Sequence, residues 1–367
     1  MSKVKITGHA SGSGVLTVTA PNTSTDRTIT LPDSTGTILD NTSTLDATKL
    51  SGNLPAISGA SLTSLPVQKI NPNILINGGF DIAQRGTTIS GIGSAKYTLD
   101  RWKATSSGAD STVTQVSGAT YPKALRLTGA GSTSGTYLQQ RVESANSRHL
   151  AGQTATFSVY LRASTAKTVE FSIGYASGGT DTFSGTTGIA SANFSVTTTD
   201  TKFTWTGSIP SAATTGIQVE LKISSQGSAW YEASNAKLEI GSTATDFEYR
   251  SYGEELAMCQ RYYQKTNTNT VFACFVNGTN QVQFSPSLNC TLRASPTVSW
   301  TGGTGNSTVV DHDGTVDSAA SNVPSAVDFN DGTNIHMIFN GWGSSLTDMR
   351  IQNLYIGNKA IAMESEL

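Results

Sequence analysis

Side chains that could hold a metal ion or a sugar gather in one short polar segment near the end of the chain. Asp311, His312 and Asp313 stand directly before a glycine, and further acidic and amide residues follow. Oxygen ligands at alternate positions suit calcium. The segment departs from an EF-hand loop, because the glycine comes early and Asn322 stands where a glutamate is wanted. Asp-His-Asp-Gly is also ordinary turn chemistry, which is the interpretation that we favour over a metal site.

Two tryptophans flank the same polar stretch. Trp300 precedes it, and Trp342 follows in the sequence NGWGSS. A flat aromatic face can stack on a sugar ring and exclude water, while acidic and imidazole groups bond the hydroxyls. The candidate glycan-binding residues are therefore Trp300, Asp311, His312, Asp313 and Trp342. Packing of the two tryptophans inside a core remains the alternative.

Sequence signatures of catalysis are missing from the chain. It contains no GxSxG, GxGxxG, GxxxxGK or HExxH pattern, and its histidines are scattered. Glu254 and Glu255 form an adjacent carboxylate pair, which could serve glycoside hydrolysis. They fall at the start of a predicted helix, however, where the helix dipole alone favours anions. Cys259, Cys274 and Cys290 lack metal-ligand spacing and are interpreted as reduced core residues. We expect no enzymatic activity.

The composition favours an all-β chain with many turns. Of 367 residues, 99 are Ser or Thr, and only 14% are charged. Threonine with aliphatic and aromatic residues suits half-buried strands, and glycine with serine suits turns. The net charge of -2 offers no large cationic surface, so nucleic acid is not an expected partner. The sequence contains no apolar run long enough to predict a membrane span. Its first residues lack the apolar stretch of a secretory signal.

Residues 1–70 differ from the rest of the chain because they contain no Phe, Trp or Tyr. Single aliphatic residues, such as Leu50, Leu54 and Leu62, recur between small polar ones. One copy of such a segment cannot bury enough apolar surface to offset the entropy of ordering it. We therefore predict an extended, intertwined stalk made by several copies, in preference to a flexible linker.

The remaining residues predict two β-sandwich domains joined by a short helix. In residues 71–250, Phe157, Val159 and Leu161 alternate on one face, and the segment TGIQVELKI alternates likewise, which is typical of a jelly roll. Ser251 and a glutamate three residues later fit the capping box of a helix over 251–265. Strand patterns then return and predict a C-terminal tip domain over 251–367, with a long, loop-rich polar stretch between Trp300 and residue 335.

Five segments, in their order along the chain, resemble parts of bacteriophage tail fibre proteins. ITGHASGSGVLTVTAPNTSTDRTITLPDSTGTILD with DATKLSGNLPAISGASLTSL resembles the N-terminal stalk of such fibres. NILINGGFDIAQRGTTI with YTLDRW, and LAGQTATFSVYLRAS, resemble their carbohydrate-binding-module-like jelly roll. NAKLEIGSTATDFEYRSYGEELAMCQRYY resembles the signature that closes that domain. LRASPTVSW and AIAMESEL resemble the last domain.

The resemblance implies a homotrimer in the virion tail, made in the host cytoplasm. Residues 1–70 would attach to tail or baseplate proteins, and the tip would bind a host surface glycan. No cofactor is expected. Jelly rolls of this kind often hold a structural calcium, and Asp81 and Asn235 stand at the first and last strands, although the usual final-strand aspartate is missing.

Two alternatives remain at this point. A tailspike-type polysaccharide depolymerase would usually carry a long β-helix, and no stacked repeat in this sequence predicts one. A secreted cellular carbohydrate-binding protein would need a leader.

Overall fold

The structure is a computed structural model of the whole chain. It describes residues 10–15, 17, 22, 24–26, 28, 72–277, 281–302, 308–310, 316–318, 325–328, 335–340, 351–356 and 359–367. The chain divides into two compact units, Met1–Pro66 and Val67–Leu367. Residues 29–71 lie outside the described residues, so the intertwined stalk and its attachment to the tail stay predictions.

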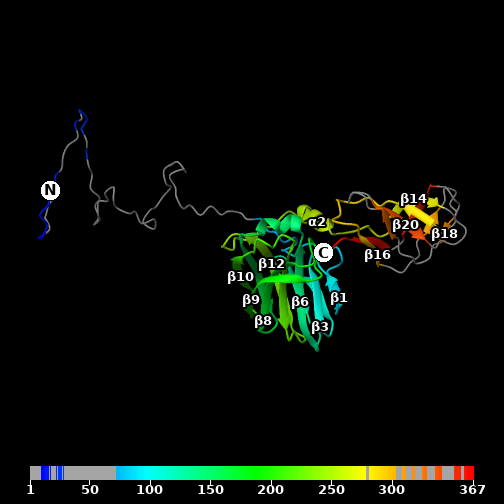
Figure 1. Ribbon diagram of the computed structural model, residues 1–367, viewed down its shortest axis with the longest axis horizontal. Helices are drawn as coiled ribbons and strands as arrows, with labels where there is room; N and C mark the ends of the chain where they lie inside the picture. The colour runs from blue at the N-terminus through cyan, green and yellow to red at the C-terminus, as the bar shows by residue number, and fades with distance from the viewer. Residues whose placement is uncertain are drawn as a thin grey trace. The chain divides into compact units, whose positions relative to one another are not determined.

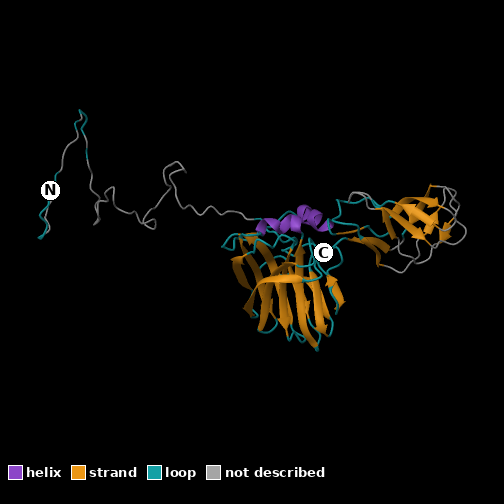
Figure 2. Cartoon of the chain, in the orientation of Figure 1, coloured by secondary structure: helices purple, strands orange, loops and turns teal. Residues whose placement is uncertain are grey.

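The described part of the chain is nearly all β-strand, as the composition predicts, with two short α-helices (Figure 2). The jelly-roll strands are β1 (Thr88–Ile92), β2 (Lys96–Tyr97), β3 (Lys103–Gly108), β4 (Ser111–Val116), β5 (Ala124–Thr128), β6 (Thr133–Val142), β7 (Thr154–Ala163), β8 (Lys167–Ala176), β9 (Thr186–Val196), β10 (Thr201–Ser208), β11 (Ile217–Ser224) and β12 (Trp230–Ile240). The C-terminal strands are β13 (Tyr263–Lys265), β14 (Val271–Asn277), β15 (Gln281–Phe284), β16 (Thr297–Gly302), β17 (Thr308–Val310), β18 (Val316–Ser318), β19 (Ser325–Asp328), β20 (His336–Asn340), β21 (Ile351–Tyr355) and β22 (Lys359–Glu364).

Two six-stranded antiparallel sheets form the jelly roll (Figure 1). Sheet A has the order β1-β4-β5-β12-β7-β10, and sheet B has the order β2-β3-β6-β11-β8-β9. Their inner faces meet in one apolar core, in which Phe157 of β7 stacks on Phe171 of β8 with ring centroids 4.3 Å apart. Residues 217, 219 and 221 of β11 are buried in alternation, which confirms the predicted sandwich.

Helix α2 (Tyr252–Gln260) links the jelly roll to the C-terminal strands, and the shorter α1 (Ser144–Ser147) precedes a 3-10 turn at Arg148–Leu150. The hydroxyl of Ser251 accepts a hydrogen bond from the backbone N–H of Glu254 at 3.3 Å, so the predicted helix start is confirmed. The helix ends earlier than predicted, because Tyr263–Lys265 leaves it to pair with β22. The buried carboxylate of Glu255 accepts from the backbone N–H of Asn77, which ties the helix to the first jelly-roll segment.

The C-terminal strands form a three-stranded sheet, β13-β22-β16, and a seven-stranded sheet, β18-β17-β21-β14-β15-β20-β19. Both contribute to a second apolar core that includes Val276, Leu354 and Ile361. Within the polar stretch that the sequence predicts to be loop-rich, the described residues include the short strands β17, β18 and β19. None of the described helices is long and apolar enough to cross a membrane.

Candidate functional site

Of the five candidate glycan-binding residues, Trp300 is the one whose placement the structure describes. Asp311, His312, Asp313 and Trp342 lie outside the described residues, so their proximity to one another stays a prediction.

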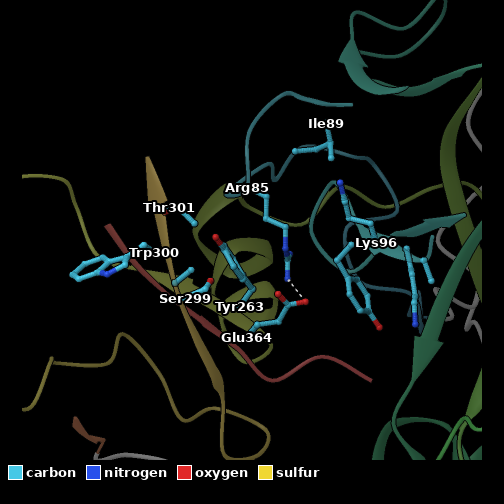
Figure 3. A pocket seen from close by; sticks show the side chains of 12 residues that line it. Arg85, Ile89, Lys96, Tyr263, Ser299, Trp300, Thr301 and Glu364 are labelled. Atoms are coloured by element: carbon cyan, nitrogen blue, oxygen red, sulfur yellow. Dashed lines mark ion pairs between the residues drawn. The ribbon is translucent and has the colours of Figure 1, made fainter. Parts of the chain in front are cut away.

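Trp300 lies on β16 beside β22, opposite Ile361. Its half-buried ring packs against the C-terminal core, with the ammonium group of Lys359 5.1 Å from the ring centroid. In Figure 3 the ring lies on the far side of its strand from Arg85 and Tyr263. The neighbouring hydroxyl residues Ser299 and Thr301 face the other way, because successive side chains of a strand point to opposite faces.

A cavity of about 770 Å³ lies on that other side of β16, where jelly-roll residues meet C-terminal ones (Figure 3). We call it the boundary pocket. Its volume falls in the range of small-molecule binding sites. It is lined by Arg85, Ile89, Ala95, Lys96, Tyr97, Lys103, Tyr263, Ser299, Trp300, Thr301, Ala362 and Glu364.

Arg85 joins the two walls of the boundary pocket. Its guanidinium carbon lies 3.8 Å from the ring centroid of Tyr263 and 5.5 Å from that of Tyr97. One terminal nitrogen lies 3.2 Å from the carboxylate of Glu366 and 3.5 Å from that of Glu364. Burial raises the pKa of Tyr263 to about 12, so this phenol stays neutral at physiological pH.

The last residues of the chain hold the jelly roll against the C-terminal sheets. Glu366 forms an ion pair with Arg101, and both side chains are almost fully buried. The carbonyl oxygen of Leu367 accepts hydrogen bonds from the Tyr97 hydroxyl and from the Arg141 guanidinium, the latter at 3.0 Å. The guanidinium of Arg293 donates to the carbonyl oxygen of Glu366 at 2.9 Å. These contacts fix the walls of the boundary pocket.

Two lysines give the boundary pocket its cationic character. The ammonium of Lys96 donates to the carbonyl oxygens of Ser90 and Gly91 at 3.4 and 3.1 Å. The ammonium of Lys103 lies 5.4 Å from the ring centroid of Tyr97, and burial together with the nearby Arg141 lowers its pKa. The two ammonium groups lie in the same pocket as the hydroxyls of Ser299 and Thr301. Together they suit a hydroxyl-rich ligand that carries negative charge.

Sequence reasoning missed Arg85, Lys103 and Tyr263 as pocket residues. They are separated by up to 178 positions in the chain and meet through pairing of β13 with β22 and docking of the C-terminal residues. The one available signal was Arg85 itself, which stands in the segment that resembles the opening of the fibre jelly roll.

Asp81 and Asn235 do not by themselves make a calcium site. Calcium takes six to eight oxygen ligands. Among the described residues, no three His, Cys, Asp or Glu side chains lie close enough to share a metal ion. The amide oxygen of Asn235 is already engaged by the hydroxyl of Tyr249 at 3.0 Å. These two side chains alone therefore do not supply the ligand set of a calcium ion.

No protein-family model matches the chain, and a search of curated proteins also found no match. Several solved structures are similar. CBM4 matches at 15% identity over 45% of this chain and 98% of its own, with a TM-score of 0.33. The xylan-binding domain CBM22-1 of Paenibacillus barcinonensis matches at 12% identity over 47% of this chain and 97% of its own, with a TM-score of 0.29. The enzymatically active domain of a tailspike protein of bacteriophage CBA120 matches at 12% identity over 46% of this chain, with a TM-score of 0.33, and the match spans 21% of that tailspike chain.

Proposed function

We propose that the protein is a non-enzymatic tail fibre of a bacteriophage that adsorbs, as a homotrimer, to an acidic polysaccharide on the host surface. The observation that carries the binding role is the boundary pocket. It combines two lysines with a pair of hydroxyl residues in a cavity large enough for more than one sugar ring.

The charge of the boundary pocket favours an acidic glycan over a neutral one. Arg85, Lys96 and Lys103 line it, against the carboxylate of Glu364. The guanidinium of Arg85 already forms ion pairs with Glu364 and Glu366. The two lysines are therefore the cations that would bind an acidic ligand. An anionic sugar would place its carboxylate or phosphate between the exposed ammonium of Lys96 and the half-buried ammonium of Lys103.

The fibre role is supported by the order of the five family-like segments. The segment that resembles the close of the fibre jelly roll contains the end of β12 and helix α2. This support comes from the sequence.

The homotrimer is supported by an apolar stripe on the seven-stranded sheet. Val271 and Tyr355 pair across β14 and β21, and each is more than a third exposed. Phe275, four pairs further along β14, is 37% exposed. Clusters of exposed large apolar side chains are typical of contact surfaces. The predicted stalk, which cannot bury its aliphatic residues as one copy, also calls for several chains.

The non-enzymatic role is supported by the carboxylates of the boundary pocket. Glycosidases of the usual kind place two carboxyl groups on either side of the scissile bond. Of the described residues that line this pocket, Glu364 alone carries a carboxylate.

An array of acidic and neutral bacterial surface polysaccharides tests the proposal. We expect the full chain to bind acidic members and Lys103→Ala to bind them about tenfold more weakly, since one ammonium is lost. Lys222→Ala is the matched control, because Lys222 pairs with Glu170 at 3.1 Å on sheet B, away from the pocket. If Lys103→Ala bound the acidic polysaccharides as tightly as the wild type, that result would contradict the proposed site. Release of soluble oligosaccharide from the array would contradict the non-enzymatic role.

A further inference from the structure

A second, smaller cavity lies on the outer face of sheet A. Val159 and Leu161 of β7 point into the core. Because successive side chains of a strand alternate, Ser158 and Tyr160 point outward. The cavity has a volume of about 170 Å³. We call it the aromatic pocket. It is lined by Tyr121, Ser158, Tyr160, Lys202, Asn235, Asp246, Phe247 and Tyr249.

Two pairs of aromatic rings form the walls of the aromatic pocket. Tyr121 and Tyr160 meet edge to face with ring centroids 4.7 Å apart, and Phe247 and Tyr249 do so at 5.0 Å. Tyr249 is half exposed, although it is a large aromatic residue. Such rings offer flat apolar surface with polar hydroxyls at the rim, which suits a ligand with one apolar face and a polar edge.

Asn235 lies in the aromatic pocket in an unusual backbone conformation. Its φ is +48°, in the left-handed region, and the pairing of β12 with β7 shifts register between Ser234 and Lys237. A bulge of this kind re-aims a side chain, and such bulges are common beside functional sites. A non-glycine residue in this conformation within a strand is strained, and strain of this kind gathers at ligand sites.

The amide group of Asn235 is only half satisfied. The residue is 2% exposed, and its amide oxygen accepts the hydrogen bond from the Tyr249 hydroxyl. Its amide nitrogen Nδ2 is buried and has no hydrogen-bond partner among the residues that the structure describes. A buried donor without an acceptor costs free energy that a ligand oxygen would recover.

The charges around the aromatic pocket disfavour an anion. Lys202 and Asp246 line it with opposite charges, and the Lys202 ammonium donates to the carbonyl oxygen of Thr245 at 3.4 Å. Besides burial, the carboxylate of Asp81 raises the pKa of Tyr249, which places another negative charge nearby. A neutral ligand therefore fits better than an acidic one.

We propose that the aromatic pocket binds one neutral pyranose ring, with a ring or acetamido oxygen accepting a hydrogen bond from Nδ2 of Asn235. The apolar face of the sugar packs on the aromatic walls, to which Tyr160 contributes, and the volume limits the site to a single ring. The site is separate from the boundary pocket in its residues, its charge and its ligand.

Saturation-transfer NMR on the full chain tests the proposal, with methyl pyranosides of glucose, galactose, mannose and N-acetylglucosamine as probes. We expect at least one probe to receive saturation and Asn235→Gly to weaken its binding at least tenfold. Glycine tolerates a positive φ, so this variant removes the amide without straining the backbone. Tyr160→Ala should also weaken binding, whereas Tyr137→Ala, a half-buried tyrosine of sheet B, should not.

Three results would overturn the proposal. The first is that no probe receives saturation, and the second is that Asn235→Gly binds the probe as tightly as the wild type does. The third is binding of calcium in place of sugar, since turning the carboxamide over would present its oxygen to a cation. A rise in melting temperature with calcium chloride, lost in Asn235→Gly, would show that outcome. The probes are neutral and Lys103 is intact in these variants. These results therefore do not bear on acidic-glycan binding in the boundary pocket, which the polysaccharide array tests separately.

Discussion

The boundary pocket and the aromatic pocket belong to the same compact unit but are built by different means. The boundary pocket is held open by buried ion pairs and the docked C-terminal residues, and two lysines line it. The aromatic pocket lies on one sheet face, and its distinctive group is a strained, half-bonded asparagine. Long-range assembly creates the first site, and a local bulge creates the second. They should therefore respond differently to truncation, charge, salt and pH.

The largest effect is expected from Glu366→Ala. It leaves the guanidinium of Arg101 buried without its carboxylate, which costs about 3–5 kcal/mol. The boundary pocket should lose its ligand, while the aromatic pocket, formed within the jelly roll, should keep its probe below the unfolding transition. Urea unfolding followed by fluorescence measures the loss of stability.

Glu364→Ala is the matched control for that change. Its carboxylate is 41% exposed and lies 3.5 Å from Arg85, so its removal should cost less than about 1 kcal/mol. Equal losses in the two variants would show that the buried pair does not hold the two parts together.

A pH effect should separate the pockets next. Burial and Arg141 lower the pKa of Lys103, so this lysine loses its charge at a lower pH than an ordinary lysine. Affinity for an acidic polysaccharide should accordingly fall at a lower pH than an ordinary lysine would cause, and Lys103→Arg, which stays charged, should keep its affinity to higher pH. Titration calorimetry between pH 7 and 10 checks this. Identical pH profiles for the wild type and Lys103→Arg would show that the charge of Lys103 does not contribute to binding.

A smaller effect is expected from Tyr249→Phe in the aromatic pocket. The change keeps the ring but removes the hydroxyl that donates to the amide oxygen of Asn235 at 3.0 Å. The free energy of unfolding should fall by about 1 kcal/mol, and the affinity for the neutral probe should fall with it as the carboxamide loses its anchor. Unchanged binding of the probe would indicate that Tyr249 does not orient Asn235.

The smallest effect concerns the backbone of Asn235. Asn235→Gly should be more stable than Asn235→Ala by about 0.5–1 kcal/mol, because glycine alone is unstrained at this φ. Thermal unfolding of the two variants side by side measures the difference. Equal stabilities would mean that the strain inferred for the bulge is absent.

The sequence predicted the elements that depend on local pattern. The alternation of Phe157, Val159 and Leu161 identified a buried strand face, and Ser251 marked the start of α2. These predictions succeeded because strand alternation and helix capping are set by residues a few positions apart.

The candidate sites could be predicted less well. The pairing of Arg85 with Glu366 joins residues from opposite ends of the described unit, and no local pattern encodes it. Nor did the sequence show that Asn235 would take a positive φ, because the register shift depends on how β7 and β12 pair. Trp300 was recognised as an aromatic of interest, but which side of β16 its ring takes is decided by the C-terminal core. Asp311, His312, Asp313 and Trp342 stay predictions.

The most direct test of the account is one experiment with two ligands on one set of proteins. An acidic polysaccharide from the array and a neutral methyl pyranoside are titrated into the wild type, Lys103→Ala and Asn235→Gly at low and high salt. We expect Lys103→Ala and high salt to weaken binding of the acidic ligand alone, and Asn235→Gly to weaken binding of the neutral ligand alone. Loss of both ligands in either variant, or equal salt dependence of the two, would contradict the existence of two separate sites.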